Sequence, residues 1–226
     1  CGTAALGPDI QKSWQVHELS DPYPVKFEVD DRKKRTVLVP NTSHAFCRIM
    51  SAALKTQGIR AVPLAVGREE AIRLGKQYVH NDICFPAQIV IGEALAALRS
   101  GQYVPSETAI GMGKYIGDCR LTHYSALLRK ALDDAGYPEV AILTNDDVDY
   151  HDLHPGFRMN LMSAIRLAGS LPMIDILEEL LRKIRPYEKV SGSSDQAFDE
   201  AMDFVVDGLE QHGQVSERNA HAAHDL

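Results

Sequence analysis

The stretch Thr36-Val37-Leu38-Val39-Pro40 decides the fold, because it has the pattern of a short buried strand that leads directly into a helix. Asn41-Thr42-Ser43 follows it and offers side chains that cap the first turn of a helix. Apolar residues then recur with helical spacing over residues 45–57, and Gly58 closes the run. These features predict a strand over 36–40 followed by a helix over 45–57.

The same alternation of strand and helix continues further along the chain. Parallel strands joined by helices cross over with one hand, so the helices cover both faces of a single sheet. The sequence therefore predicts an α/β fold, a Rossmann-like or flavodoxin-like parallel sheet of about four strands with helices on both faces. The further strands are predicted over 59–66, 108–112 and 140–144, and the further helices over 68–79, 87–99 and 121–135.

Composition and periodicity outside this alternation predict the remaining parts of the chain. After residue 150 no strand pattern returns, and helices are predicted over 157–184, with a break at Leu171-Pro172, and over 195–212. The predicted division is an irregular N-terminal arm (1–35), a cysteine-bearing α/β domain (36–150), a helical extension packed on it (151–214) and a frayed tail (215–226).

The bulk composition narrows the classes of function. The 226 residues carry a net charge of −7, which argues against a nucleic-acid partner, because phosphate binding needs clustered Lys and Arg. No apolar stretch reaches the length of a membrane span, so we expect a cytoplasmic protein without a membrane partner. The chain begins at Cys1 without Met, which suggests a piece of a longer polypeptide.

Four cysteines are too few for a disulfide scaffold, so metal or redox chemistry is the better expectation. Cys84 and Cys119 each stand just before a predicted helix, where unpaired N–H groups favour negative charge. Ligands of an open parallel sheet gather at this edge, so both thiols are candidate metal ligands. Cys47 is either a third ligand or a buried apolar residue beside Met50 and Leu54.

None of the cysteines forms a C-x-x-C pair, so neither a zinc ribbon nor a local ferredoxin loop is indicated. Any shared metal would need ligands that converge in space from distant parts of the chain. Other candidates for a further ligand are Cys1, on the N-terminal arm, and His80, Asp82 and Asp118, which are also typical turn residues.

Three motifs carry a family resemblance: Asn81-Asp-Ile-Cys-Phe-Pro86, Gly117-Asp-Cys-Arg120 and Arg185-Pro-Tyr-Glu188. With their surroundings, over residues 36–208, they resemble the cysteine-bearing region of the large 2-hydroxyacyl-CoA dehydratase activase-like proteins. That region is itself similar to the dehydratase subunits and to the double-cubane cluster proteins.

The resemblance implies an iron–sulfur cluster, of the 4Fe–4S type or a double cubane, bound by Cys84 and Cys119 and less surely by Cys47. Arg120 and Tyr124 match positions beside the cluster cysteine. In the family, an ATP-hydrolysing activase supplies a low-potential electron for dehydration of an acyl-CoA. No phosphate-binding motif of such an ATPase is found here, so the resemblance implies a second chain or a missing part as its source.

Two hypotheses follow. The first is an iron–sulfur redox module, a component of a dehydratase-like lyase or of a reductase, which in a homodimer would share a cluster between copies. The second is a non-catalytic structural or interaction domain that has lost the cluster or binds zinc.

Overall fold

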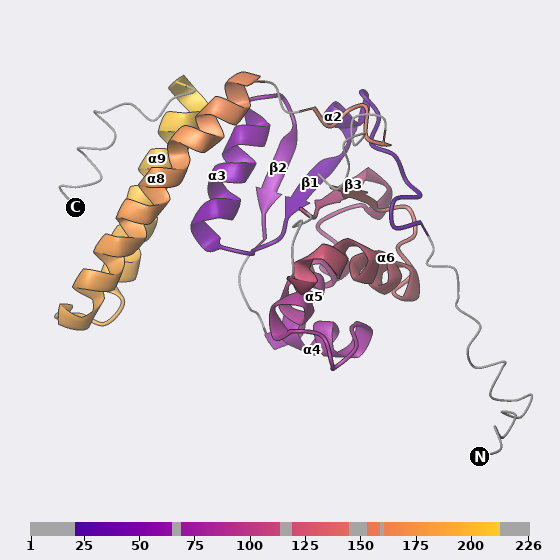
Figure 1. The fold of residues 1–226 in the computed structure, drawn as a ribbon, viewed down its shortest axis with the longest axis horizontal. Coiled ribbons are helices and arrows are strands. Elements are labelled where there is room, and N and C mark those ends of the chain that lie inside the picture. Colours follow the sequence, from indigo (N-terminus) through magenta and orange to yellow (C-terminus); the bar gives the residue numbers. More distant parts are fainter. Residues whose placement is uncertain (1–20, 65–68, 114–118, 145–152, 159–160, 213–226) are drawn as a thin grey trace, which may run out of the picture.

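A four-stranded sheet forms the centre of the molecule (Figure 1). The computed structural model describes residues 21–64, 69–113, 119–144, 153–158 and 161–212. All described strand pairs are parallel, and the strand order is β2-β1-β3-β4. The strands are β1 (Thr36–Val39), β2 (Arg60–Pro63), β3 (Thr108–Gly111) and β4 (Ala141–Leu143).

The predicted α/β fold is confirmed. From β1 the chain moves outward to β2, then returns past β1 to form β3 and β4 on the other side. The direction of winding therefore reverses between β1 and β3. In open parallel sheets this reversal opens a crevice beyond the carboxyl ends of the strands, where ligands bind.

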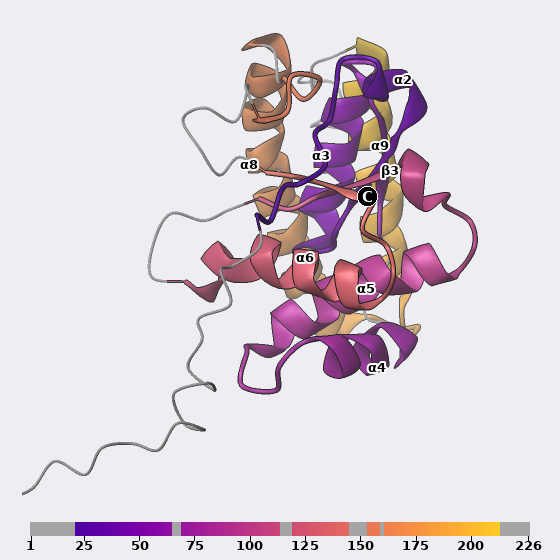
Figure 2. The ribbon, with the colours of Figure 1, turned by 90° about the vertical axis from the view of Figure 1, so that its right-hand side faces the viewer.

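Side chains alternate between the two faces of the sheet, as the pleat requires. Leu38 and Ile110 point into a core built with α4, α5 and α6, which we call the α5/α6 face. Val37 and Val39 point the other way, into a core with Cys47 and Leu54 of α3, which we call the α3 face. Helices cover both faces, as predicted (Figure 2).

The helices of the α/β domain begin and end close to the predicted positions. Ser43 caps α3 by accepting a hydrogen bond from the Phe46 N–H at 3.4 Å. Pro86 lies in the first turn of α5, where its missing N–H costs nothing. The main helices are α3 (His44–Lys55), α4 (Glu69–Tyr78), α5 (Phe85–Arg99) and α6 (Tyr124–Asp134), and the short ones are α2 (Asp31–Lys34), η1 (Pro105–Glu107) and η2 (Arg120–His123).

Helices α4 and α5 form an antiparallel pair whose backbones nearly touch. A Cβ atom at Gly75 would lie 1.9 Å from the Gln88 carbonyl oxygen, and one at Gly92 would lie 1.8 Å from that of Ala71. Only glycine permits this approach. The turn that joins the two helices carries Cys84, so the glycine contact fixes the position of that turn.

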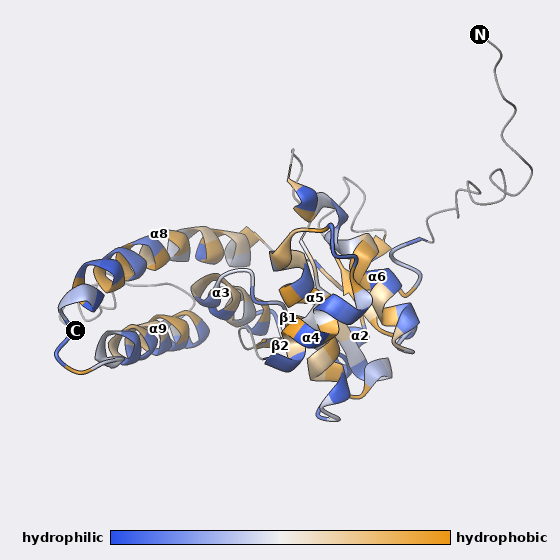
Figure 3. Ribbon diagram, turned by 90° about the horizontal axis from the view of Figure 1, so that it is seen from below, coloured by the Kyte–Doolittle hydropathy of each residue, from blue (hydrophilic) through white to orange (hydrophobic). Residues whose placement is uncertain are grey.

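Helices α8 (Leu161–Ile184) and α9 (Ser193–His212) lie against the outer side of α3 rather than on the sheet (Figure 3). Ile49 and Ala52 of α3 meet apolar side chains of both helices in a second core. The turn between them contains η3 (Arg185–Tyr187). The predicted break at Pro172 is wrong, since α8 continues through it. The proline lies on the exposed side, where water can bond the carbonyl group that loses its partner.

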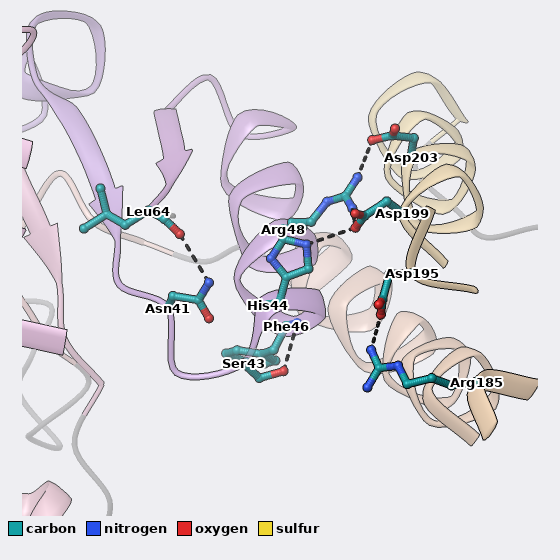
Figure 4. Close-up of polar contacts among 10 residues, drawn as sticks. All are labelled: Asn41, Ser43, His44, Phe46, Arg48, Leu64, Arg185, Asp195, Asp199 and Asp203. Carbon is teal, nitrogen blue, oxygen red and sulfur yellow. Dashed lines mark hydrogen bonds and ion pairs between the residues drawn. The ribbon is translucent and has the colours of Figure 1, made fainter. Parts of the chain in front are cut away.

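A row of ion pairs joins α3 to α9 (Figure 4). His44 pairs with Asp199 at 3.2 Å, Arg48 pairs with Asp203, and Lys55 pairs with Glu210 at 3.0 Å. In each pair the two partners are 155 positions apart in the sequence. The two helices therefore run parallel with matching turns. In the same region Arg185 pairs with Asp195.

Residues 21–30 have no regular structure but pack against the domain. Phe27 is fully buried on the α3 face, and Tyr23 is buried on the α5/α6 face, where its hydroxyl lies 3.0 Å from that of Ser125. Of the arm expected over residues 1–35, this part therefore belongs to the packed domain. Among the described helices, none combines the length and apolar character needed to cross a membrane.

Candidate functional site

Two of the predicted ligands stand at the starts of helical segments, as expected. Cys84 precedes α5, but the turn that carries it joins two helices rather than a strand and a helix. Cys119 precedes η2 in the connection that follows β3. Both residues have extended backbone conformations, and neither side chain caps its helix. The thiols are therefore not engaged by the helix backbone.

Contacts between the two connecting segments bring Cys84 close to residues that follow Cys119. The Cys84 Sγ lies 2.9 Å from the Tyr124 hydroxyl, although these residues are 40 positions apart. The Arg120 guanidinium donates a hydrogen bond of 2.8 Å to the carbonyl oxygen of Asp82. Cys119 lies close enough to Tyr124 for its charge to act on the phenol. The structure thus gathers the residues that the two cysteine motifs supply.

Tyr124 holds its proton strongly in this position. Burial raises the pKa of its hydroxyl well above the ordinary value, and the hydrogen bond with Cys84 raises the pKa further. Negative charge on Cys84 and Cys119 acts in the same direction. A phenol that stays protonated next to an ionised thiol donates the hydrogen bond to sulfur. Tyr124 is therefore placed as a possible hydrogen-bond donor to the Cys84 sulfur.

The site is open to solvent. Cys119 is exposed, Cys84 is half-buried, and the neighbouring Phe85 is 50% exposed although it is aromatic. Pro86 is exposed as well. A pair of thiols beside an exposed apolar side chain can accept a bulky inorganic group or another protein chain.

Cys47 lies elsewhere. It is buried on the α3 face with Leu54 and Met50, whereas Cys84 packs against the core of the α5/α6 face. Its Sγ donates a hydrogen bond of 2.8 Å to the Pro40 carbonyl oxygen. Of the two alternatives left open by the sequence, these surroundings match the buried apolar residue.

The described residues contain no group of three or more His, Cys, Asp or Glu side chains that could hold a metal ion. His80 and Asp82 contact each other at 3.5 Å on the exposed turn before Cys84, a contact typical of turn residues. Cys1 and Asp118 lie outside the described residues. The site as described therefore offers two thiols from one chain.

One feature near the carboxyl ends of the strands was missed by sequence reasoning. A cavity of about 430 Å³ lies on the α3 face, lined by Cys47 and by residues of β1, β3 and β4. The signal for it is the alternation of small residues, Ala109, Gly111 and Ala141, with the large Ile110 and Ile142. Small side chains on one face leave space there, while the opposite face is filled.

Comparisons of this chain with protein-family models, with curated proteins and with solved structures found no match.

Proposed function

We propose that this chain is an iron–sulfur redox module that holds a 4Fe–4S or double-cubane cluster on Cys84 and Cys119. The observation that carries the proposal is the Cys84–Tyr124 contact at 2.9 Å, which joins two motifs far apart in the sequence. Thiolates are the ligands of iron–sulfur clusters. When bound, such a cluster supplies one-electron transfer at low potential.

Two thiols are half of the four that a cubane takes. A homodimer that meets at the exposed Cys119 would supply two further thiols from a second copy. The exposed Phe85 gives such a contact an apolar surface next to the sulfur atoms. This arrangement needs no third ligand from the same chain, and it leaves Cys47 in the core.

The surrounding residues have distinct parts in this proposal. With the Cys84 sulfur bound to iron, Tyr124 would be the donor of their hydrogen bond, and donation to sulfur orients a ligand and tunes its electron density. Arg120 ties the Cys119 segment to the turn before Cys84 and adds a positive charge next to an anionic group. Neither residue needs to bind iron to influence it.

The family resemblance supplies the wider role in this proposal. The chain would take part in low-potential electron transfer, or in ATP-driven reductive chemistry of the 2-hydroxyacyl-CoA dehydratase type. An ATP-hydrolysing activase on another chain, or on a missing part of this one, would provide the electron. An acyl-CoA is the substrate that this role implies.

A second candidate is a structural or interaction domain that has lost the cluster or binds zinc. A structural zinc site also takes four ligands. Two thiols from each of two chains would supply them, so the described site suits zinc as well. Metal analysis separates the candidates, because zinc proteins are colourless and contain no sulfide.

The test is anaerobic reconstitution, followed by iron and acid-labile sulfide analysis and a visible spectrum. We expect brown protein with about two iron atoms per chain for one cubane shared by two copies, or about four for a shared double cubane. Cys84→Ser and Cys119→Ser should each abolish iron binding. Cys47→Ser is the matched control and should retain it. Full iron content in both of the first two variants would rule out the proposal.

A further inference from the structure

The α3 face carries a second site. The cavity of about 430 Å³ lies where the winding of the sheet reverses, and its wall includes Val39 from the end of β1 and Gly111 from the end of β3. This is the position at which open parallel sheets bind small molecules. The volume lies within the range of ligand pockets in proteins.

The walls of the cavity come from α3, from the sheet and from the segment that carries Phe157. Helix α3 packs mainly against β1 and β2, so it covers chiefly that part of this face. Over β3 and β4 the cover comes from Phe27 and Phe157, whose rings meet edge to face at 6.5 Å. The small side chains of Ala109 and Ala141 belong to the same buried cluster.

The segment that carries Phe157 is fixed to residues 27–32. The Gly156 N–H donates to the Phe27 carbonyl oxygen at 2.8 Å, and the Arg32 guanidinium donates to the Gly156 carbonyl oxygen at 2.6 Å. A Cβ atom at Gly156 would lie 2.0 Å from the Glu28 carbonyl oxygen, so the two segments meet backbone to backbone. Phe157 therefore forms a fixed wall of a preformed pocket.

The lining defines the chemistry of an occupant. The described residues that line the cavity are mostly apolar and uncharged, and such surroundings suit a neutral molecule. Phe46 and Phe157 offer aromatic faces or edges, and Met50 and Met112 offer sulfur atoms that contact rings favourably. A cavity of about 150 Å³ admits one benzene ring, so this one has room for two fused rings.

Two threonines line the cavity, Thr42 with an exposed side chain and Thr144 with a buried one. Thr144 is 1% exposed, it lines the cavity, and its hydroxyl has no hydrogen-bond partner among the described residues. A buried hydroxyl without a partner is costly. Its oxygen has almost no accessible surface, so a ligand oxygen would satisfy it once the Thr144 side chain rotates toward the cavity. We infer that this cavity binds a neutral, flat aromatic molecule of about two fused rings with one hydroxyl or carbonyl oxygen directed at Thr144.

The probes for a test are 2-naphthol and naphthalene, which differ by one hydroxyl group. The chain is labelled with ¹³C at its methionine methyl groups and titrated with each probe. Met50 and Met112 line the cavity, while Met173 and Met202 lie in the separate core under α8 and α9 and serve as the internal reference. We expect saturable shifts at the first two residues and about fivefold tighter binding of 2-naphthol, the worth of one hydrogen bond.

Two variants make the test specific. Gly111→Val narrows the cavity at the end of β3, and the new side chain is tolerated because a Cβ atom there meets nothing closer than the Leu38 carbonyl oxygen at 3.8 Å. It should fold and lose binding of both probes. Thr144→Val keeps the shape and removes the hydroxyl, so it should bind naphthalene unchanged and lose the preference for 2-naphthol.

The inference is overturned if neither probe saturates, if the reference methionines shift equally, or if binding survives Gly111→Val. An undiminished preference in Thr144→Val would refute the role of that hydroxyl. The site does not depend on iron. Binding should be the same in Cys84→Ser protein, so this result and the result of the iron analysis can fail separately.

Discussion

On the α5/α6 face, the Cys84 thiol is half-buried and lies 2.9 Å from a phenol held in its protonated form. On the α3 face, Cys47 is 1% exposed and donates its only proton to the Pro40 carbonyl oxygen. The two residues have the same chemistry in isolation. The first sulfur faces a phenol, which can donate a hydrogen bond to it, whereas the second faces a backbone carbonyl group, which only accepts.

The contrast shows that the partner of a thiol, and not its place near the start of a helix, separates a candidate ligand from a core residue. Both cysteines lie near the N-terminus of a helix. Four predictions test whether the two faces differ in the way described.

The largest effect is expected from Gly75→Val, which disturbs the packing of α4 on α5 on the α5/α6 face. Its side chain would displace α5 from α4, and we expect a loss of about 3 kcal/mol or more in the free energy of unfolding. Urea unfolding measures it. Gly169→Ala is the control, since a Cβ atom there has nothing within 4 Å, and it should add about 0.5 to 1 kcal/mol. Equal stability of the two variants would contradict the tight contact.

The α3 face should respond to acid through His154, whose Nδ1 accepts the Phe27 N–H at 3.3 Å near the wall formed by Phe157. Burial lowers the pKa of His154 from 6.5 to about 4. Between these values the unfolded chain binds more protons, so stability falls as the pH falls. The loss from pH 7 to pH 4 should be about 3 kcal/mol.

Unfolding curves at several pH values measure this slope. His154→Gln removes the titrating group, so its stability should depend less on pH over the same window. If the wild-type and His154→Gln curves are parallel, the assignment of this acid sensitivity to His154 is wrong.

The rates at which the cysteines of the two faces react should also differ, which is a smaller effect. In reduced, metal-free protein we expect an alkylating reagent to modify Cys119 first, Cys84 more slowly, and Cys47 on the order of a hundredfold more slowly than Cys119. Modification of Cys47 requires local opening of the core. Peptide mass spectrometry over time gives the order, and early modification of Cys47 would erase the contrast between the faces.

The smallest effect is expected from Tyr124→Phe, which removes one hydrogen bond of about 1 kcal/mol without changing shape. In protein that holds a cluster, losing a donor to sulfur should lower the reduction potential, because the donor stabilises the more negative reduced state. A redox titration measures the shift. An unchanged or raised potential would show that the phenol does not act on the bound sulfur.

Much of the fold could be predicted because short-range patterns determine it. The run of buried residues before Asn41 and the cap at Ser43 placed the first strand and helix within a few residues of their observed ends. Cys47 shares its helix face with Met50 and Leu54, and that spacing already offered the buried alternative.

Other features depend on contacts between distant segments, which no local pattern reports. The close approach of Gly75 to Gln88 fixes the position of the turn before Cys84. From the sequence alone, a glycine within a helix indicates only low helix propensity. Pro172 predicts a break in the helix, but α8 continues through it because the proline is exposed. The Cys84–Tyr124 contact likewise appears only when both connecting segments are placed in space.

The even spacing of 155 residues across α3 and α9 has a consequence for how the chain can change in length. One residue inserted within α9 would rotate everything beyond it by about 100° and move it by about 1.5 Å, so downstream charges would miss their partners together. An insertion in the turn between α8 and α9 would leave that phase intact. Natural variation in chain length should therefore collect in that turn and spare both helices.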